Sequence, residues 1–474
     1  MVFIILLNFI SNIFLIKFQY IKIKLFMRFN MKKITILNKK YDINLQKLNL
    51  KRCDFLDLPA EICNLINLQK LNLFFNQLKS LPAEIGNLRN LKELNLSDNQ
   101  LKSLPAEIGN LINLQILDLW ANKIKTLPAE ISNLHNLKEL YLSDNKLQSL
   151  PAEIANLTNL QLLYLHTNKL QSFPVEICNL CNLKDLCISN NQLQSLPAEI
   201  GNLRDLKTLI ISNIELQSFP AEICNLHNLK KLYISNNQLQ SLAAEIGNLR
   251  NLKELNLSNN RLQNLPAEFG NLINLQELEL SNNKLQSFPA EIDNLRDLKT
   301  LDLSCNKLQT LPAEIDNLHN LQKLYLNNNK LQSLPAVIGN LHNLQELNLS
   351  YNQLQNLPAE ISNLCNLKYL YLSNNQIQSL PAEILKIKNI IQIDDTSYDV
   401  NNLNIDNEIL IFTNLKDKIN NLPFNIKEIW LKSDIKNYDI KLPISVGKLC
   451  NLLFDKYNSS KFIKLPILAG KLSN

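Results

Sequence analysis

Residues 91–113 read Leu-Lys-Glu-Leu-Asn-Leu-Ser-Asp-Asn-Gln-Leu-Lys-Ser-Leu-Pro-Ala-Glu-Ile-Gly-Asn-Leu-Ile-Asn, and the same pattern returns through most of the chain. Units with this spacing begin at residue 45 and at every twenty-third residue up to 367, so that fifteen units occupy residues 45–389. Each unit is apolar at positions 1, 4, 6, 11, 14, 18 and 21. Such a period is typical of a solenoid, because one unit cannot bury its apolar face alone and stacking creates the core.

The spacing of the apolar positions predicts the structure of one unit. Positions 3 to 7 alternate as a short strand, in which Leu94 and Leu96 point into the core and positions 3, 5 and 7 point outward. Positions 18 and 21 suit one turn of helix, which the proline at position 15 can start without losing a needed donor. We therefore expect an α/β solenoid, a curved horseshoe with a parallel β-sheet on its concave face and short helices or 3-10 turns on its convex face.

Position 9 carries the most informative polar residue of the unit. It is Asn in thirteen of the fifteen units, and a buried amide there can donate to and accept from the backbone of adjoining turns. The exceptions are Cys53 and Ile214, and isoleucine cannot form these hydrogen bonds. The unit of Ile214 is therefore interpreted either as a flaw or flexible point in the ladder, or as a substitution that its surroundings repair.

These units resemble the intracellular leucine-rich repeats of the Ras-suppressor type, which share the pattern LPxEIxxLxxLxxLxLxxNxL, and those of Scribble-like scaffolds. The resemblance covers residues 45–389. It implies a leucine-rich-repeat solenoid that serves as a protein-interaction scaffold, often in signal transduction, in the cytoplasm. It transfers no contact residues, because the outward strand positions differ between such proteins.

Composition and charge argue against catalysis and against a nucleic-acid ligand. The chain has 8 Gly and 5 His, too few for glycine-rich phosphate loops or histidine-based metal clusters. The net charge is +6, but residues 1–44 alone carry +7 and the rest of the chain sums to −1, which removes the electrostatic reason for nucleic-acid binding. We therefore expect a protein partner, with no enzyme activity, no cofactor and no metal.

Cysteine and histidine positions support the same expectation. The nine cysteines are odd in number and form no cluster at either flank, which favours a reducing compartment. Cys178 and Cys181 form a C-x-x-C pair, but no second pair has matching spacing, so a surface accident is the better interpretation. Four histidines share position 22 and are interpreted as solvated turn residues: His135, His227, His319 and His342.

The flanks of the repeat region differ from it in composition. Residues 1–44 form an apolar and then basic segment that would cap the first repeat, and residues 390–474 are interpreted as degenerate repeats and a C-terminal cap. Three interpretations of residues 1–26 stay open. They are an over-long start with Met27 or Met31 as the true initiator, a membrane-associating segment, or a cleaved signal, the last of which would suit a secreted or host-directed protein.

The outward strand positions predict a binding surface. At position 5, five consecutive units from Tyr141 to Tyr233 are apolar or aromatic, whereas the units at both ends are mostly polar. Neighbouring columns add further large side chains, and strands in register would bring all of these side chains together. An exposed aromatic patch with a polar rim is typical of protein-binding hot spots. The predicted partner-binding residues are Phe74, Ile116, Trp120, Tyr141, Leu162, Tyr164, His166, Ile210 and Tyr233.

Overall fold

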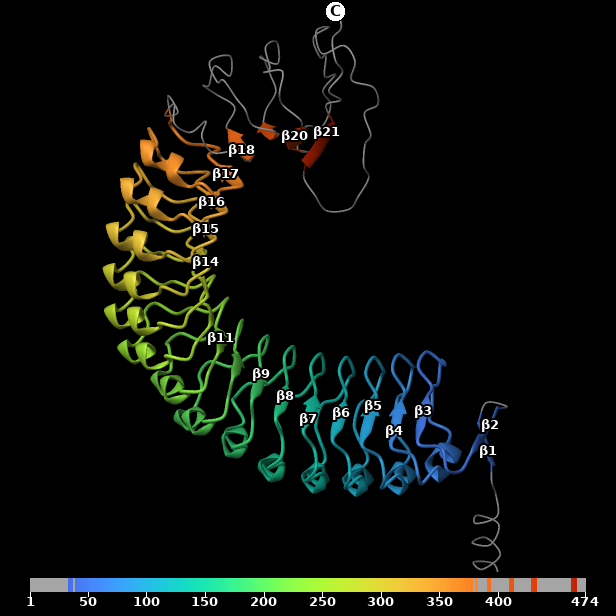
Figure 1. Cartoon of the computed structure of the whole chain (residues 1–474). Helices are drawn as coiled ribbons and strands as arrows, with labels where there is room; N and C mark the ends of the chain where they lie inside the picture. Colours follow the sequence, from blue (N-terminus) through green and yellow to red (C-terminus); the bar gives the residue numbers. More distant parts are fainter. Residues whose placement is uncertain are drawn as a thin grey trace, which may run out of the picture. The chain divides into compact units, whose positions relative to one another are not determined.

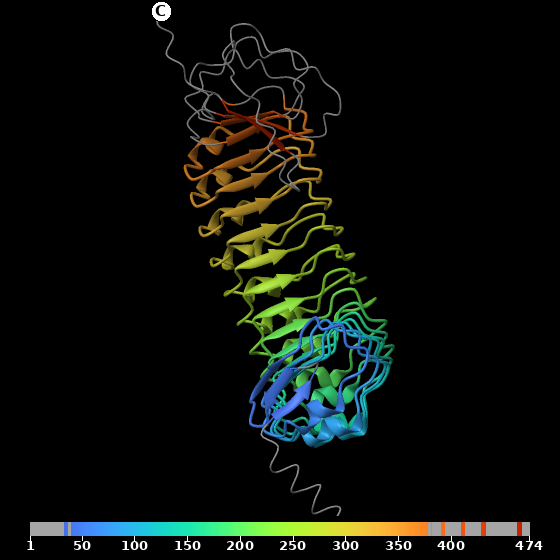
Figure 2. The ribbon, with the colours of Figure 1, turned by 90° about the vertical axis from the view of Figure 1, so that its right-hand side faces the viewer.

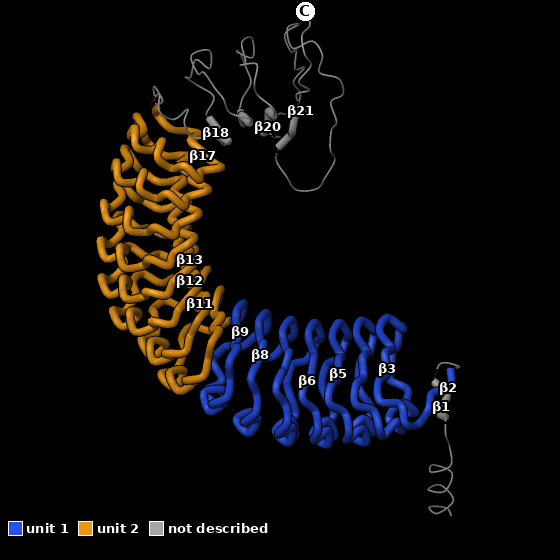
Figure 3. The backbone as a smooth tube through the Cα atoms, in the orientation of Figure 1, with its two compact units in different colours: residues 1–191 blue, residues 192–474 orange. Residues whose placement is uncertain are grey.

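A computed structural model describes residues 33–36 and 39–377, Pro381, and four later strands at residues 390–393, 409–412, 428–432 and 462–466. The chain divides into two compact units, residues 1–191 (unit 1) and residues 192–474 (unit 2), shown in different colours in Figure 3. Each unit is described by itself below. Residues 1–32, on which the interpretations of the apolar N-terminal segment depend, lie outside the described residues.

Unit 1 begins with an antiparallel pair, β1 (Lys33–Ile36) and β2 (Lys39–Asp42). Seven three-residue strands follow and pair in parallel, each in register with the next. They are β3 (Lys47–Asn49), β4 (Lys70–Asn72), β5 (Glu93–Asn95), β6 (Ile116–Asp118), β7 (Glu139–Tyr141), β8 (Leu162–Tyr164) and β9 (Asp185–Cys187). The 3-10 helices between them lie on the side opposite the strands (Figure 1): η1 (Ala60–Asn64), η2 (Ala83–Asn87), η3 (Ala106–Asn110), η4 (Ala129–Asn133), η5 (Ala152–Asn156) and η6 (Val175–Asn179).

Unit 2 continues the same pattern with parallel strands that lie side by side in Figure 2. Its repeat strands are β10 (Thr208–Ile210), β11 (Lys231–Tyr233), β12 (Glu254–Asn256), β13 (Glu277–Glu279), β14 (Thr300–Asp302), β15 (Lys323–Tyr325), β16 (Glu346–Asn348) and β17 (Tyr369–Tyr371). Its 3-10 helices are η7 (Ala198–Asn202), η8 (Ala221–Asn225), η9 (Ala244–Asn248), η10 (Ala267–Asn271), η11 (Ala290–Asn294), η12 (Ala313–Asn317), η13 (Ala336–Asn340) and η14 (Ala359–Asn363).

Four strands follow the last repeat strand. β18 (Ile390–Ile393), β19 (Ile409–Phe412) and β20 (Glu428–Lys432) extend the parallel pairing from β17, and β21 (Phe462–Pro466) pairs with β20 in the antiparallel direction. The predicted boundaries of the flanking segments stay predictions. Within the described part of the chain, no helix is long and apolar enough to cross a membrane.

The core consists of the predicted framework positions. In the third repeat, Leu91, Leu94, Leu96, Leu101 and Ile108 are fully buried, and equivalent residues are buried in almost every repeat of both units. The strands are shorter than expected, covering positions 3 to 5 instead of 3 to 7. Beyond position 5 the chain turns, and in the third repeat the side chain of Asn95 accepts a hydrogen bond from the Ser97 N–H two residues later (2.9 Å). As a consequence Ser97 at position 7 is 2% exposed, although the strand alternation predicted an outward position.

The helical segment of each of the first fourteen repeats is a 3-10 helix at positions 16 to 20. The proline at position 15 precedes it in an extended conformation, and its carbonyl accepts the first hydrogen bond, as between the Ile108 N–H and Pro105 (3.1 Å). One repeat lacks this proline, and Ala243 there adopts the same backbone, with φ −71 and ψ 148. The stack of neighbouring repeats therefore imposes the conformation that proline favours elsewhere.

The asparagines at position 9 form the predicted ladder. The Oδ1 atom of Asn122 accepts the N–H of Leu101 in the preceding repeat (3.0 Å), and its amide donates to the carbonyls of Leu96 (3.0 Å) and Leu119 (3.1 Å). A second ladder, on the exposed edge, uses the asparagines at position 23. Asn136, for example, donates to the carbonyl of Ile112 in the preceding repeat (2.8 Å). Side-chain amides therefore replace many of the backbone partners that a longer helix or sheet would supply.

The two repeats without this asparagine share a different turn. In all fifteen repeats the residue at position 8 has a positive φ, but only Asp54 and Glu215 also have a positive φ at position 10. In both repeats the N–H of position 9 donates to the asparagine of the next repeat, from Cys53 to Asn76 (3.0 Å) and from Ile214 to Asn237 (3.2 Å). Ile214 is fully buried, and its side chain lacks the acceptor that position 9 offers to the preceding repeat elsewhere, as Asn191 does to the Leu170 N–H (3.0 Å). The turn therefore accommodates isoleucine, at the cost of a second left-handed residue.

Candidate protein-binding surface

The outward positions of unit 1 bring four of the predicted residues onto adjacent strands. Ile116 lies on β6, Tyr141 on β7, and Leu162 and Tyr164 on β8, and all four side chains are half-buried. The register pairs Tyr141 directly with Tyr164, and their rings meet edge to face with centroids 5.6 Å apart. The Tyr141 hydroxyl donates to Glu139 (2.8 Å). These contacts hold two aromatic rings on the sheet face without placing them in the core.

Large side chains alternate with serine at position 7 along unit 1. The column reads Phe74, Ser97, Trp120, Ser143 and His166. Trp120 is 40% exposed, and its indole N–H donates to Asp144 of the next repeat (2.6 Å). Phe74 contacts Phe75 (centroids 5.9 Å apart). It follows β4, two strands away from β6, which precedes Trp120. Trp120 and His166 therefore extend the patch of Ile116, Tyr141, Leu162 and Tyr164, whereas Phe74 lies at a distance from it.

The hollow on this sheet face has a volume of about 480 Å³ and runs from β3 to β7. Its lining includes Ile116, Asp118, Glu139 and Tyr141, and its far end contains Lys70, which forms an ion pair with Glu93. The apolar side chains of the patch thus stand at one end of an open groove with charged walls. A groove of this size can hold side chains of a bound polypeptide.

Carboxylates in and beside this groove repel one another. Burial, and after it the charge of Asp144, raises the pKa of Asp98. Burial also raises the pKa of Asp118. Hydrogen bonds from the Trp120 N–H and from Ser97 lower this pKa, and the negative charge of Asp98 raises it. The pKa of Tyr141 is raised by burial and by its hydrogen bond to Glu139. The carboxylates therefore give this surface more negative charge than its cationic side chains neutralise.

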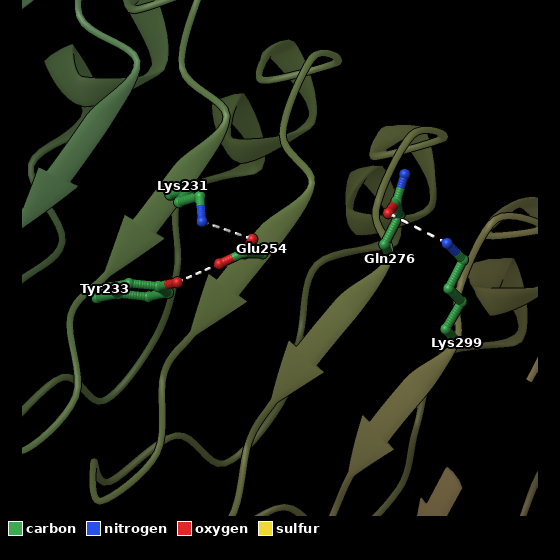
Figure 4. Close-up of polar contacts among 5 residues, drawn as sticks. All are labelled: Lys231, Tyr233, Glu254, Gln276 and Lys299. Carbon is green, nitrogen blue, oxygen red and sulfur yellow. Dashed lines mark hydrogen bonds and ion pairs between the residues drawn. The ribbon is translucent and has the colours of Figure 1, made fainter. Parts of the chain in front are cut away.

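The two remaining predicted residues, Ile210 and Tyr233, belong to unit 2 and are direct neighbours in the register of β10 and β11. They line a hollow of about 200 Å³ together with Glu254, Glu277 and Glu279. Figure 4 shows that the Tyr233 hydroxyl and the amine of Lys231 both reach Glu254, the latter at 2.8 Å. These two residues form a separate small site whose charges are partly paired.

The C-x-x-C pair does not lie wholly on the surface, as its interpretation as a surface accident required. Cys178 is buried because it lies in the 3-10 helix η6 beside the core, whereas Cys181 is exposed, and the two form no disulfide. The four histidines at position 22 are exposed in turns: His135, His227, His319 and His342. Among the described residues, no group of three or more His, Cys, Asp or Glu side chains is placed to hold a metal ion.

Comparison with protein-family models gives matches over most of the repeats. The model described as leucine-rich repeat region matches residues 83–188, 174–281 and 263–353, and two further leucine-rich-repeat models match residues 342–386 and 67–88. The chain belongs to the leucine-rich-repeat family. A comparison with curated protein sequences gives no match.

Solved structures of leucine-rich-repeat proteins are similar to this chain. A leucine-rich-repeat protein of Leptospira interrogans is 45% identical, with a TM-score of 0.71 over 73% of this chain and 89% of that protein. The plant peptide hormone receptor RGFR1, solved in complex with RGF2, is 29% identical, with a TM-score of 0.59 over 78% of this chain and 64% of the receptor. An internalin of Listeria monocytogenes is 25% identical, with a TM-score of 0.58 over 71% and 90%. The leucine-rich-repeat fold is typical of protein-interaction modules.

Proposed function

We propose that this leucine-rich-repeat protein is a non-catalytic scaffold that binds a protein or peptide partner on the sheet face of unit 1. The observation that carries the proposal is the group of large side chains on adjacent outward positions, Ile116, Trp120, Tyr141, Leu162 and Tyr164. Their apolar surface fills no core position, and exposed aromatic patches of this kind mark binding sites. The complex of a similar plant receptor with its peptide hormone supports a polypeptide ligand.

The test is affinity purification followed by mass spectrometry, with the double variant Trp120→Ala/Tyr164→Ala beside the wild type. We expect a partner that the wild type captures and the double variant loses, because truncating aromatic hot-spot residues costs 2 kcal/mol or more, roughly thirtyfold in affinity. The affinity is then measured with the purified partner. The matched control is Ile112→Ala, an isoleucine that is 51% exposed but lies in the turn after η3. Equal affinity of the double variant and the control would place the binding site elsewhere.

We further propose that the protein is a cytoplasmic signalling scaffold of the Ras-suppressor type, on the pattern of its repeat and its free cysteines. A second candidate is a secreted or host-directed recognition protein, since a Leptospira interrogans leucine-rich-repeat protein and a Listeria internalin are among the similar structures. Fractionation of cells that express the native start separates the two candidates. Recovery of the protein in the medium or the membrane fraction would contradict the cytoplasmic proposal.

A further inference from the structure

The patch of unit 1 lies in a surface with one sign of charge. We define the acidic–aromatic surface as positions 3 to 8 of repeats 3 to 7, which are residues 93–98, 116–121, 139–144, 162–167 and 185–190. These residues include no Lys or Arg and six carboxylates: Glu93, Asp98, Asp118, Glu139, Asp144 and Asp185. Within the described part of the chain, Glu93 is the one member of this set that forms an ion pair. The other five carboxylates form no ion pair with any described residue, although Asp118, Glu139 and Asp144 accept hydrogen bonds from neutral groups.

Rings and carboxylates alternate along one edge of this surface. From repeat to repeat, positions 7 and 8 supply Asp98, Trp120, Asp144 and His166. Because neighbouring strands are about 4.8 Å apart, Asp144 belongs to the repeat between those of Trp120 and His166, whose strands are about 10 Å from each other. The hydrogen bond from the Trp120 indole to Asp144 fixes one ring against its carboxylate.

A buried hydroxyl in the same place lacks a partner. Ser143 is 2% exposed, and it is the residue whose side-chain oxygen forms no hydrogen bond with any described residue. It lies on the coil between those of Trp120 and His166, since the Ala121 N–H donates to its carbonyl (3.0 Å) and the Asp144 N–H donates to that of His166 (2.9 Å). An unsatisfied buried hydroxyl is unfavourable, and this one belongs to the acidic–aromatic surface, next to Asp144 in the sequence.

We infer that the acidic–aromatic surface binds an extended, Lys/Arg-rich segment of a partner protein, with basic side chains on Asp98 and Asp144 in the two repeats that flank Trp120. This inference rests on the proposed function of the same surface and names the chemistry of its partner. A guanidinium or ammonium group can pair with a carboxylate and stack on an aromatic face at once. An acidic segment would be repelled, and a wholly apolar segment would bury five carboxylates without a counter-charge.

The experiment selects peptides from a phage-displayed library of random dodecapeptides on the immobilised full-length protein. The enriched peptides are synthesised and their affinities are measured by fluorescence anisotropy at low and high salt. We expect enrichment of Lys and Arg, loss of binding in Trp120→Ala, and affinity at least tenfold lower in Asp98→Asn/Asp144→Asn, with the difference shrinking at high salt. The double variant keeps its fold, because Asn occupies position 8 in many other repeats, such as Asn190 and Asn236, with the same positive φ.

Controls separate the inference from the proposed function. Glu277→Gln/Glu279→Gln, in the acidic hollow of unit 2, should leave the affinity unchanged. Peptides that depend on Trp120 but lack basic residues, or that bind Asp98→Asn/Asp144→Asn as tightly as the wild type, would overturn the inference alone. Peptides indifferent to Trp120→Ala would overturn the proposed function as well. If analytical ultracentrifugation shows a dimer of the wild type that dissociates in Asp98→Asn/Asp144→Asn, the molecule bound at this surface is a second copy of the chain and the inference of a separate partner protein is wrong.

Discussion

Replacing Asn122 with alanine tests whether the buried ladder of asparagines holds neighbouring repeats together. The variant removes the acceptor of the Leu101 N–H, which then has no partner in a buried place. The carbonyls are less affected, because Leu96 still accepts from Asn99 (2.9 Å) and Leu119 from Asn145 (2.9 Å). One stranded N–H costs about 1–3 kcal/mol, and with the void left by the amide we expect a loss of about 2–4 kcal/mol.

The assay is guanidinium denaturation followed by circular dichroism, together with hydrogen exchange of the Leu101 amide. Asn136→Ala is the matched control, because Asn136 also donates to the preceding repeat (2.8 Å) but is exposed, so that water replaces it at a cost of about 0.5 kcal/mol or less. Since a solenoid is stabilised by neighbouring pairs of repeats, we expect faster exchange to be concentrated around residues 96–122. Equal losses of stability in the two variants, or unchanged exchange at Leu101, would refute the reasoning.

Three further predictions follow from the geometry of single repeats. Ala243→Pro should raise the free energy of unfolding by about 0.4–1 kcal/mol, because φ is −71 there and proline restricts the unfolded chain; a lower melting temperature would contradict this. Thr167→Asn should stabilise by about 1 kcal/mol, because a β-branched residue is strained at φ 57 and asparagine is not, and denaturation measures it. At pH 8 the thiols of Cys63 and Cys224, whose pKa burial raises to about 12, should resist iodoacetamide while exposed Cys53, Cys181 and Cys365 are alkylated; peptide mass spectrometry of labelled native protein decides.

The sequence was sufficient to predict the features that depend on spacing. The period of 23 residues, the buried framework, the parallel strands and the role of Asn122 and its equivalents all follow from residues that repeat at fixed offsets. The turn after the strand could not be predicted in this way. Position 8 has a positive φ whether it is asparagine, as in Asn236, or alanine, as in Ala121, because neighbouring coils impose the conformation and its sequence signal is weak.

The candidate surface was predicted in part, for a related physical reason. The register placed Tyr141 beside Tyr164 as the alternation of the strand required. The same alternation predicted that Ser97 points outward, but the strand ends at Asn95 and the turn buries the serine. The carboxylates on the same face were visible in the sequence, yet their lack of ion pairs depends on which side chains reach them, and spacing alone does not show that.

The local departures from the repeat coincide with the candidate surface. In unit 2, position 7 is serine in most repeats and position 8 is usually asparagine, the residue that best tolerates a positive φ. In unit 1 the pairs Phe74–Phe75, Trp120–Ala121 and His166–Thr167 replace both residues at once, and each places a less suitable residue at a positive φ. Substitutions made for packing would not favour an exposed ring beside a strained turn. Since strain of this kind persists where a function requires it, the repeats of Trp120 and His166 support the proposal of a binding surface on unit 1.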